Sequence, residues 1–137
     1  MKHSPNAPCP CHSGEKYKKC CQPYHRGSFP STAQKLMRSR YSAYALHLAD
    51  YIIHTTHSNN PDFTDNTLVW RDSIWEFCHT TQFIGLKIFE FTEEKEEAFV
   101  TFEAKLSEGM MREKSRFLKV AGKWLYESGT FTETDLH

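Results

Sequence analysis

The sequence contains no apolar run that approaches the ~20 residues a helix needs to cross a bilayer. Residues 1–9 carry one early cation and no apolar stretch, which is not the pattern of a secretory signal. The 137-residue chain has no net charge, because its 17 Lys and Arg balance 17 Asp and Glu. These absences predict a cytoplasmic protein that binds neither a membrane nor DNA.

Sequence signatures of common enzymes are also lacking. There is no Gly-rich phosphate loop, no Gly-x-Ser-x-Gly nucleophile motif and no His-Glu-x-x-His motif. The hydrophobic content of 39% and aromatic content of 14% are nevertheless typical of a globular protein,. A chain of this length accommodates one compact domain and a small appendage.

The charges are unevenly distributed along the chain. Residues 1–40 contain eight Lys and Arg and one Glu, which gives a net charge of +7. Residues 41–137 contain nine Lys and Arg and sixteen Asp and Glu, which gives −7. This asymmetry predicts a basic docking end on an acidic body.

Four of the five cysteines lie close together: Cys9, Cys11, Cys20 and Cys21. The surrounding segment is rich in Pro and Lys and has no apolar period, so it needs something other than a core of its own to order it. Four thiolates suit tetrahedral Zn²⁺, leave no open coordination position and therefore predict one structural zinc ion. The alternatives are disulfides, a redox switch, copper(I), an iron–sulfur cluster, or His12 or His25 replacing one cysteine.

The run Cys-Pro-Cys-His-Ser-Gly-Glu-Lys-Tyr-Lys-Lys-Cys-Cys, from Cys9 to Cys21, resembles the SEC-C motif of the translocase motor SecA and of many bacterial proteins. His12 stands where that motif usually has Gly. The resemblance implies that all four cysteines bind zinc. The metal would then fix the backbone of a rigid basic surface that we expect to dock on an acidic protein or the ribosome: Lys16, Tyr17, Lys18 and Lys19.

Apolar positions recur at helical spacing in two segments. Ser31 and Gln34 have the capping-box spacing, and one apolar face continues from Met37 to Ile52. A second helix is predicted over residues 67–79. Beyond residue 80 the period is two, and strands are predicted at about 82–92, 97–106, 110–120 and 123–131. The order predicts an α+β fold with helices packed on a curved antiparallel sheet that encloses a pocket.

Three longer segments, residues 36–44, 49–57 and 115–126, are similar to the bacterial YchJ family. That resemblance implies a SEC-C element followed by a domain similar to nuclear transport factor 2 (NTF2), in which helices and a curved sheet form a cone. It places a zinc-binding element at residues 1–25 and the α+β domain at residues 26–137.

Other residues are candidates for a binding site. Pocket candidates are Arg38, Arg40, Tyr41 and Tyr44, since Arg binds carboxylate and phosphate groups. The alternative is that the arginines pair with carboxylates such as Asp72 or Glu76.

The leading functional prediction is a non-enzymatic adaptor, monomeric or homodimeric, that docks through its basic SEC-C element. The alternative is an isomerase- or dehydratase-like enzyme that uses the pocket. Its candidate residues are Asp50, Tyr41, His54 and Arg116.

Overall fold

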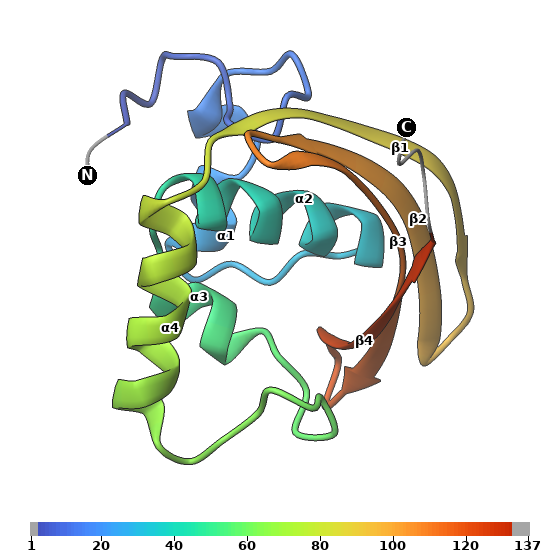
Figure 1. The fold of residues 1–137 in the computed structure, drawn as a ribbon. Helices are drawn as coiled ribbons and strands as arrows, with labels where there is room; N and C mark the ends of the chain where they lie inside the picture. The colour runs from blue at the N-terminus through green and yellow to red at the C-terminus, as the bar shows by residue number, and fades with distance from the viewer. Residues whose placement is uncertain (1–2, 133–137) are drawn as a thin grey trace.

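The computed structural model describes residues 3–132. Its elements are a 3₁₀ turn, four helices and four strands (Figure 1). In chain order they are η1 (Tyr17–Lys19), α1 (Gln22–His25), α2 (Ala33–Ala45), α3 (Ala49–His54), α4 (Thr67–His79), β1 (Phe83–Glu93), β2 (Glu97–Leu106), β3 (Gly109–Val120) and β4 (Lys123–Thr132).

The four strands form one antiparallel meander in the order β1-β2-β3-β4, as predicted. The sheet curves around α2, and α4 stands beside its open side (Figure 1). In β2 every second side chain is buried, from Ala98 to Ala104, and faces the helices. Irregularities in the register within β1 and at Arg116/Phe117 add local bends, which strengthen the curvature,. The predicted α+β class is confirmed.

The predicted N-cap of α2 was wrong by one residue. Thr32, not Ser31, caps the helix, because its hydroxyl accepts a hydrogen bond from the Lys35 amide at 3.1 Å,. The amide of Ala33 donates to the Glu93 carboxylate at 3.0 Å. The start of α2 is therefore held against the end of β1.

The single helical face predicted from Met37 to Ile52 was also wrong, because the chain turns between α2 and α3. His47 adopts a positive φ of 63°. The amide of Leu48 donates to Ala43 O and that of His47 to Tyr44 O, which is a Schellman ending,. The turn lets α3 pack across α2, so that residues at the end of α3 reach side chains in the middle of α2.

The N-terminal element shares the core of the domain. Cys11 and Tyr17 are buried in the same cluster as Leu36, Phe117 and Trp124. The segment thus acquires from α2 and the sheet the apolar contacts that its own sequence lacks. Division of the chain at residue 25 stays a prediction.

Within residues 3–132, the helices are all too short or too polar to span a bilayer.

Candidate functional site

The four predicted cysteines come together in one cluster. Their sulfur atoms all lie within 4.8 Å of one another. The Cys11 and Cys20 sulfurs are 3.5 Å apart, and those of Cys20 and Cys21 are 3.9 Å apart. A tetrahedral zinc site with 2.3 Å bonds requires sulfur separations of about 3.8 Å. The cluster therefore fits a metal ion.

Backbone hydrogen bonds shape the loop that carries these thiols. The amide of Cys9 donates to Glu15 O at 2.8 Å, and that of Tyr17 donates to Ala7 O at 2.9 Å. His12, with a φ of 63°, adopts the left-handed conformation that Gly usually provides,. Its ring lies 3.2 Å from Phe83 O, so the replacement ties the loop to β1.

Without a cation the thiols perturb one another strongly. Hydrogen bonding to Cys11, together with burial, raises the pKa of Cys9 to about 12. Hydrogen bonds from Cys21 and Cys9 lower the pKa of Cys11. The cluster thus favours a shared negative charge on few thiols, and a bound cation would allow all four to be deprotonated.

Arg38 lies beside this cluster and not in the pocket where the sequence placed it. Its Nη1 donates to Cys11 O at 3.1 Å and lies 3.8 Å from the Cys11 sulfur. The physical reason is helical rotation: Arg38 and Arg40 are two residues apart and so point ~200° apart around α2. Arg38 is placed to balance negative charge on the thiolates.

Neither histidine that was considered as a ligand belongs to the metal-binding group. His25 lies between Tyr17 and α2. The Tyr17 hydroxyl is 2.6 Å from its Nδ1, and Ser39 O is 2.9 Å from its Nε2. Burial lowers the pKa of His25. A neutral ring that accepts from Tyr17 and donates to Ser39 satisfies both contacts.

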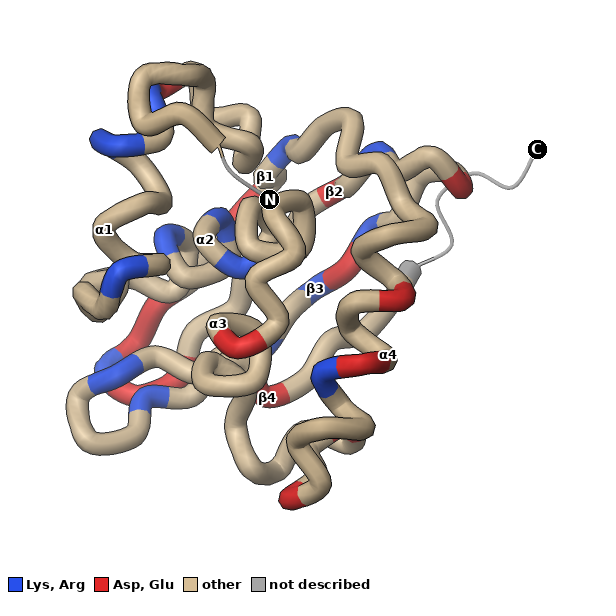
Figure 2. The backbone as a smooth tube through the Cα atoms, turned by 90° about the vertical axis from the view of Figure 1, so that its left-hand side faces the viewer, with Lys and Arg blue, Asp and Glu red and all other residues tan. Residues whose placement is uncertain are grey.

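The predicted basic surface holds only its lysines. Lys16, Lys18 and Lys19 are exposed, whereas Tyr17 is 6% exposed and faces the core. Blue positions follow the N-terminal element beside α1, while red positions recur along α4 (Figure 2). Tyr17 is therefore a packing residue, which corrects its assignment to the docking surface.

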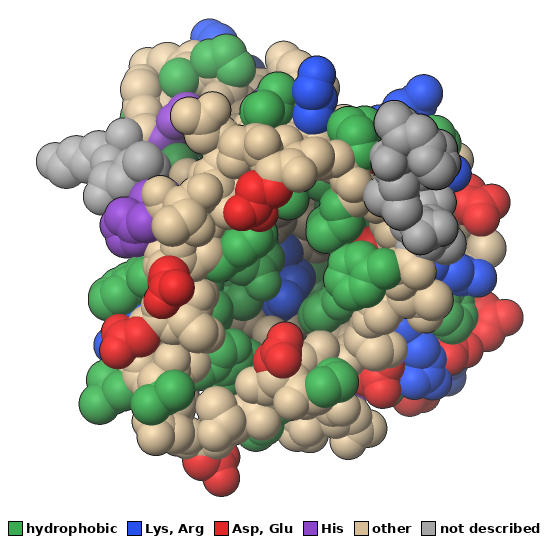
Figure 3. Space-filling view, viewed as in Figure 1, with side chains coloured by type: hydrophobic (Ala, Val, Ile, Leu, Met, Phe, Trp, Pro, Cys, Tyr) green, Lys and Arg blue, Asp and Glu red, His purple; other side chains and the backbone are tan. Residues whose placement is uncertain are grey.

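A cavity of about 260 Å³ opens between the helices and the concave face of the sheet. It appears as a central hollow among hydrophobic side chains, with blue in its floor (Figure 3). Among the described residues that line it, Arg40 is the one Lys or Arg. The aromatic lining comes from Tyr41, Tyr44, Trp70, Phe77, Phe83, Phe102, Phe117, Tyr126 and Phe131.

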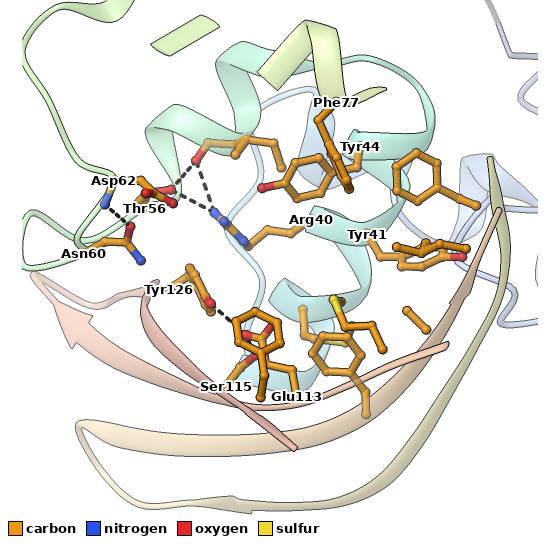
Figure 4. Close-up of a pocket in the computed structure, with 18 of the residues that line it drawn as sticks. Arg40, Tyr41, Tyr44, Thr56, Asn60, Asp62, Phe77, Glu113, Ser115 and Tyr126 are labelled. Carbon is orange, nitrogen blue, oxygen red and sulfur yellow. Dashed lines mark hydrogen bonds between the residues drawn. The ribbon is translucent and has the colours of Figure 1, made fainter. Parts of the chain in front are cut away.

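Arg40 forms no ion pair within residues 3–132, so the predicted pairing with Asp72 or Glu76 was wrong. It is 8% exposed. Its Nη1 donates to Ile52 O and to the Thr56 hydroxyl, both at 3.1 Å (Figure 4). The same Nη1 also donates to the Thr55 hydroxyl at 2.7 Å. The C-terminal end of α3 and the two residues that follow it supply these acceptors.

Glu113 is a second buried charge in the cavity. Its Oε2 accepts from the hydroxyls of Ser115 at 2.6 Å and Tyr126 at 2.7 Å (Figure 4). Burial, followed by the charge of Glu113, raises the pKa of Tyr126, so this hydroxyl stays a donor. Gly129 leaves room for the carboxylate, because a Cβ there would overlap Glu113 Oε2.

Sequence reasoning missed Glu113 as a site residue. Glu113 shares its strand face with the buried residues Ser115 and Phe117. On the neighbouring strand β2, Phe102 lies opposite Glu113 and Val100 lies opposite Ser115, and both are buried. A carboxylate at an inward position of an alternating strand was the signal that could have identified it.

Three of the four residues predicted for an enzymatic site do not line the cavity. Asp50 pairs with Arg71 at 2.9 Å, and Arg116 pairs with Glu97 at 2.8 Å. His54 lines a separate groove beside α3. Only Tyr41 lines the cavity, and its hydroxyl donates to Gly85 O at 3.0 Å.

The fold and the cysteine cluster define a class of protein in which a SEC-C element is joined to an NTF2-like domain. The family model "YchJ, middle NTF2-like domain" matches residues 32–129, and the SEC-C model matches residues 6–23. The chain belongs to the YchJ family, whose curated relatives carry the name UPF0225.

Relatives match along most of their length. The chain is 40% identical over 131 residues to a UPF0225 protein of Serratia proteamaculans, covering 89% of this chain and 82% of the relative. It is also 40% identical over 126 residues to one of Deinococcus radiodurans, with 89% and 88% covered.

Solved structures agree with the fold. A SEC-C motif containing protein from Rhodopseudomonas palustris superposes with a TM-score of 0.80 at 31% identity, covering 93% of this chain and all of that one. One from Psychrobacter arcticus gives 0.72 at 29% identity, covering 93% and 84%.

Proposed function

We propose that this chain is a cytoplasmic, zinc-stabilised protein that binds a small molecule in the cavity of its NTF2-like domain. The observation that carries the proposal is the open cavity. Tyr44, Phe77 and Phe83 contact one another edge-on or stacked along its wall and leave about 260 Å³ unfilled. A mostly apolar hollow with a few polar groups is the usual form of a small-molecule site.

Filling the cavity is expected to abolish binding of a neutral aromatic probe. Ala104 is 1% exposed and lines the hollow, so Ala104→Trp would occupy it. We expect saturation-transfer NMR to show indole bound to the wild-type protein and not to this variant. Thr101→Trp, at a position on β2 that does not line the cavity, is the control and should bind like the wild type. Equal transfer in all three proteins would contradict the proposal.

A second function is proposed from the exposed lysines. The loop that carries them is bounded by the cysteine cluster on both sides, and the rest of the chain is net acidic. Lys16, Lys18 and Lys19 therefore form a rigid basic surface suited to an acidic protein partner or the ribosome. In this role the protein would be an adaptor.

Reversing the charge of this surface is expected to weaken such docking. In pull-downs from lysate, the triple change of Lys16, Lys18 and Lys19 to Glu should recover less of any partner than the wild type at low salt. High salt should reduce wild-type recovery, since exposed charges are screened within ~8–10 Å. Changing Lys95, Lys105 and Lys114 to Glu gives the same net charge elsewhere and serves as the control. Equal recovery of partners by all three proteins would contradict the proposed docking role.

A further inference from the structure

Arg40 presents unused hydrogen-bond donors to the cavity. All of its hydrogen bonds to described residues use Nη1. Its Nε and Nη2 have no hydrogen-bond partner among the described residues, and both keep some accessible surface. A buried cation without an ion pair is costly to maintain unless something pairs with it. The free edge of the guanidinium therefore points to an anionic group of a ligand.

The guanidinium is held in a fixed orientation. The hydroxyls of Thr55 and Thr56 bind one end, and its carbon atom lies 4.6 Å from the centre of the Tyr126 ring. Arg offers a planar fork that binds a carboxylate through two parallel hydrogen bonds. Because little side-chain freedom is left to lose, binding at this fork is preorganised.

Glu113 supplies the complementary acceptor. Its Oε2 is used by Ser115 and Tyr126, whereas Oε1 has no hydrogen-bond partner within residues 3–132 and is not sealed off. Arg40 and Glu113 both line the cavity and are not within ion-pairing distance of each other. Figure 4 shows Tyr126 and Glu113 on the sheet side and Arg40 on the helix side.

The walls and the charge balance limit the ligand further. An apolar cavity of roughly 150 Å³ holds benzene, so about 260 Å³ accommodates one or two fused rings,. Arg40 is opposed by Glu113 and by the exposed Asp62 at the cavity wall. These carboxylates repel a dianion such as phosphate more strongly than a monoanion, so a single acidic group is the more favourable partner for Arg40.

We propose that the cavity binds a small aromatic monocarboxylic acid that also carries a hydroxyl or amino group. The carboxylate would bind the free edge of Arg40, and the hydroxyl or amino group would donate to Glu113. This ligand class rests on the proposed small-molecule function of the same cavity.

Three matched probes test this recognition on the wild-type protein. They are 6-hydroxy-2-naphthoate, its amide, which lacks the charge, and 2-naphthoate, which lacks the donor. Titration calorimetry is expected to give the hydroxy acid an affinity about 10- to 100-fold above that of the amide, because hydrogen bonds to charged groups are the stronger ones. Loss of the hydroxyl should cost about three- to tenfold.

Two variants assign the effect to the residues. In Arg40→Met the acid and the amide should bind alike. In Glu113→Gln, which keeps a polar acceptor, the preference for hydroxynaphthoate over naphthoate should shrink while the preference for acid over amide is kept. Circular dichroism checks that both variants fold, and the wild-type comparison stands without them.

The outcomes separate this inference from the proposed function. If the amide binds as tightly as the acid, or if none of the three probes binds while indole does, the ligand class is wrong and the cavity function stands. If indole also fails to bind the wild-type protein, the cavity function itself is wrong. Selective binding of the hydroxy acid that depends on Arg40 supports both.

Discussion

Replacing Cys20 by Ser is expected to abolish the zinc binding that we propose for the cysteine cluster and to lower the melting temperature by roughly 10–20 °C. The sulfur of Cys20 lies 3.5 and 3.9 Å from those of Cys11 and Cys21, so its loss opens the tetrahedron. Zinc contributes roughly 10–16 kcal/mol in isolated zinc-binding peptides. Because the element here also packs on the core, losing about a third of that value already gives the stated shift.

Elemental analysis and thermal unfolding of reduced protein test this expectation. Wild-type protein should contain one zinc per chain, and Cys20→Ser close to none. The fifth cysteine gives the control: Cys78 is buried on α4 outside the cluster, so Cys78→Ala should keep its zinc. Iron in the wild-type protein, or unchanged zinc in Cys20→Ser, would contradict a structural zinc site bound by four cysteines.

Chemistry that depends on residue type and short spacing could be predicted from the sequence. The two cysteine pairs predict a cluster because the loop between them is short and contains Gly14, which adopts a φ of 91°. The strands could be predicted because side chains alternate faces with a period of two, whatever the sheet packs against. Both patterns are local, and both are retained in the fold.

Features set by long-range packing could not be predicted. Arg38 and Arg40 have the same chemistry, and only the position of the cluster and the cavity on either side of α2 gives them different roles. The end of α2 at His47 lacks the Gly that usually marks a Schellman motif,. Because the sequence does not reveal that turn, it does not indicate that Arg40 contacts the hydroxyls of Thr55 and Thr56.

Tyr17 shows the same limit, because its neighbours in sequence are exposed lysines while its ring is buried. The ring is buried in the same core cluster as Leu36 and Phe117, and its hydroxyl is linked through the His25 ring to the backbone of Ser39 on α2. Burial raises the pKa of Tyr17 to about 12, so the hydroxyl remains a donor at neutral pH. Tyr17 therefore joins the SEC-C element to the domain.

Replacing Tyr17 by Ala is accordingly expected to lower the free energy of unfolding by about 3–5 kcal/mol, the cost of removing a buried aromatic ring. Tyr17→Phe keeps the ring and removes only the hydroxyl, so it should cost about 1–2 kcal/mol, including the unpaired Nδ1 of His25. Lys18→Ala, at the exposed neighbour, is the control and should change stability by less than about 0.5 kcal/mol.

Urea unfolding of the zinc-loaded proteins measures these differences, and binding to any captured partner is measured in parallel. A packing role predicts a large loss of stability for Tyr17→Ala, a smaller one for Tyr17→Phe and unchanged partner binding wherever the variant is folded. If Tyr17→Ala instead keeps the stability of the wild type and loses the partner, Tyr17 belongs to the docking surface, and the burial of its ring in the core contributes little to the fold.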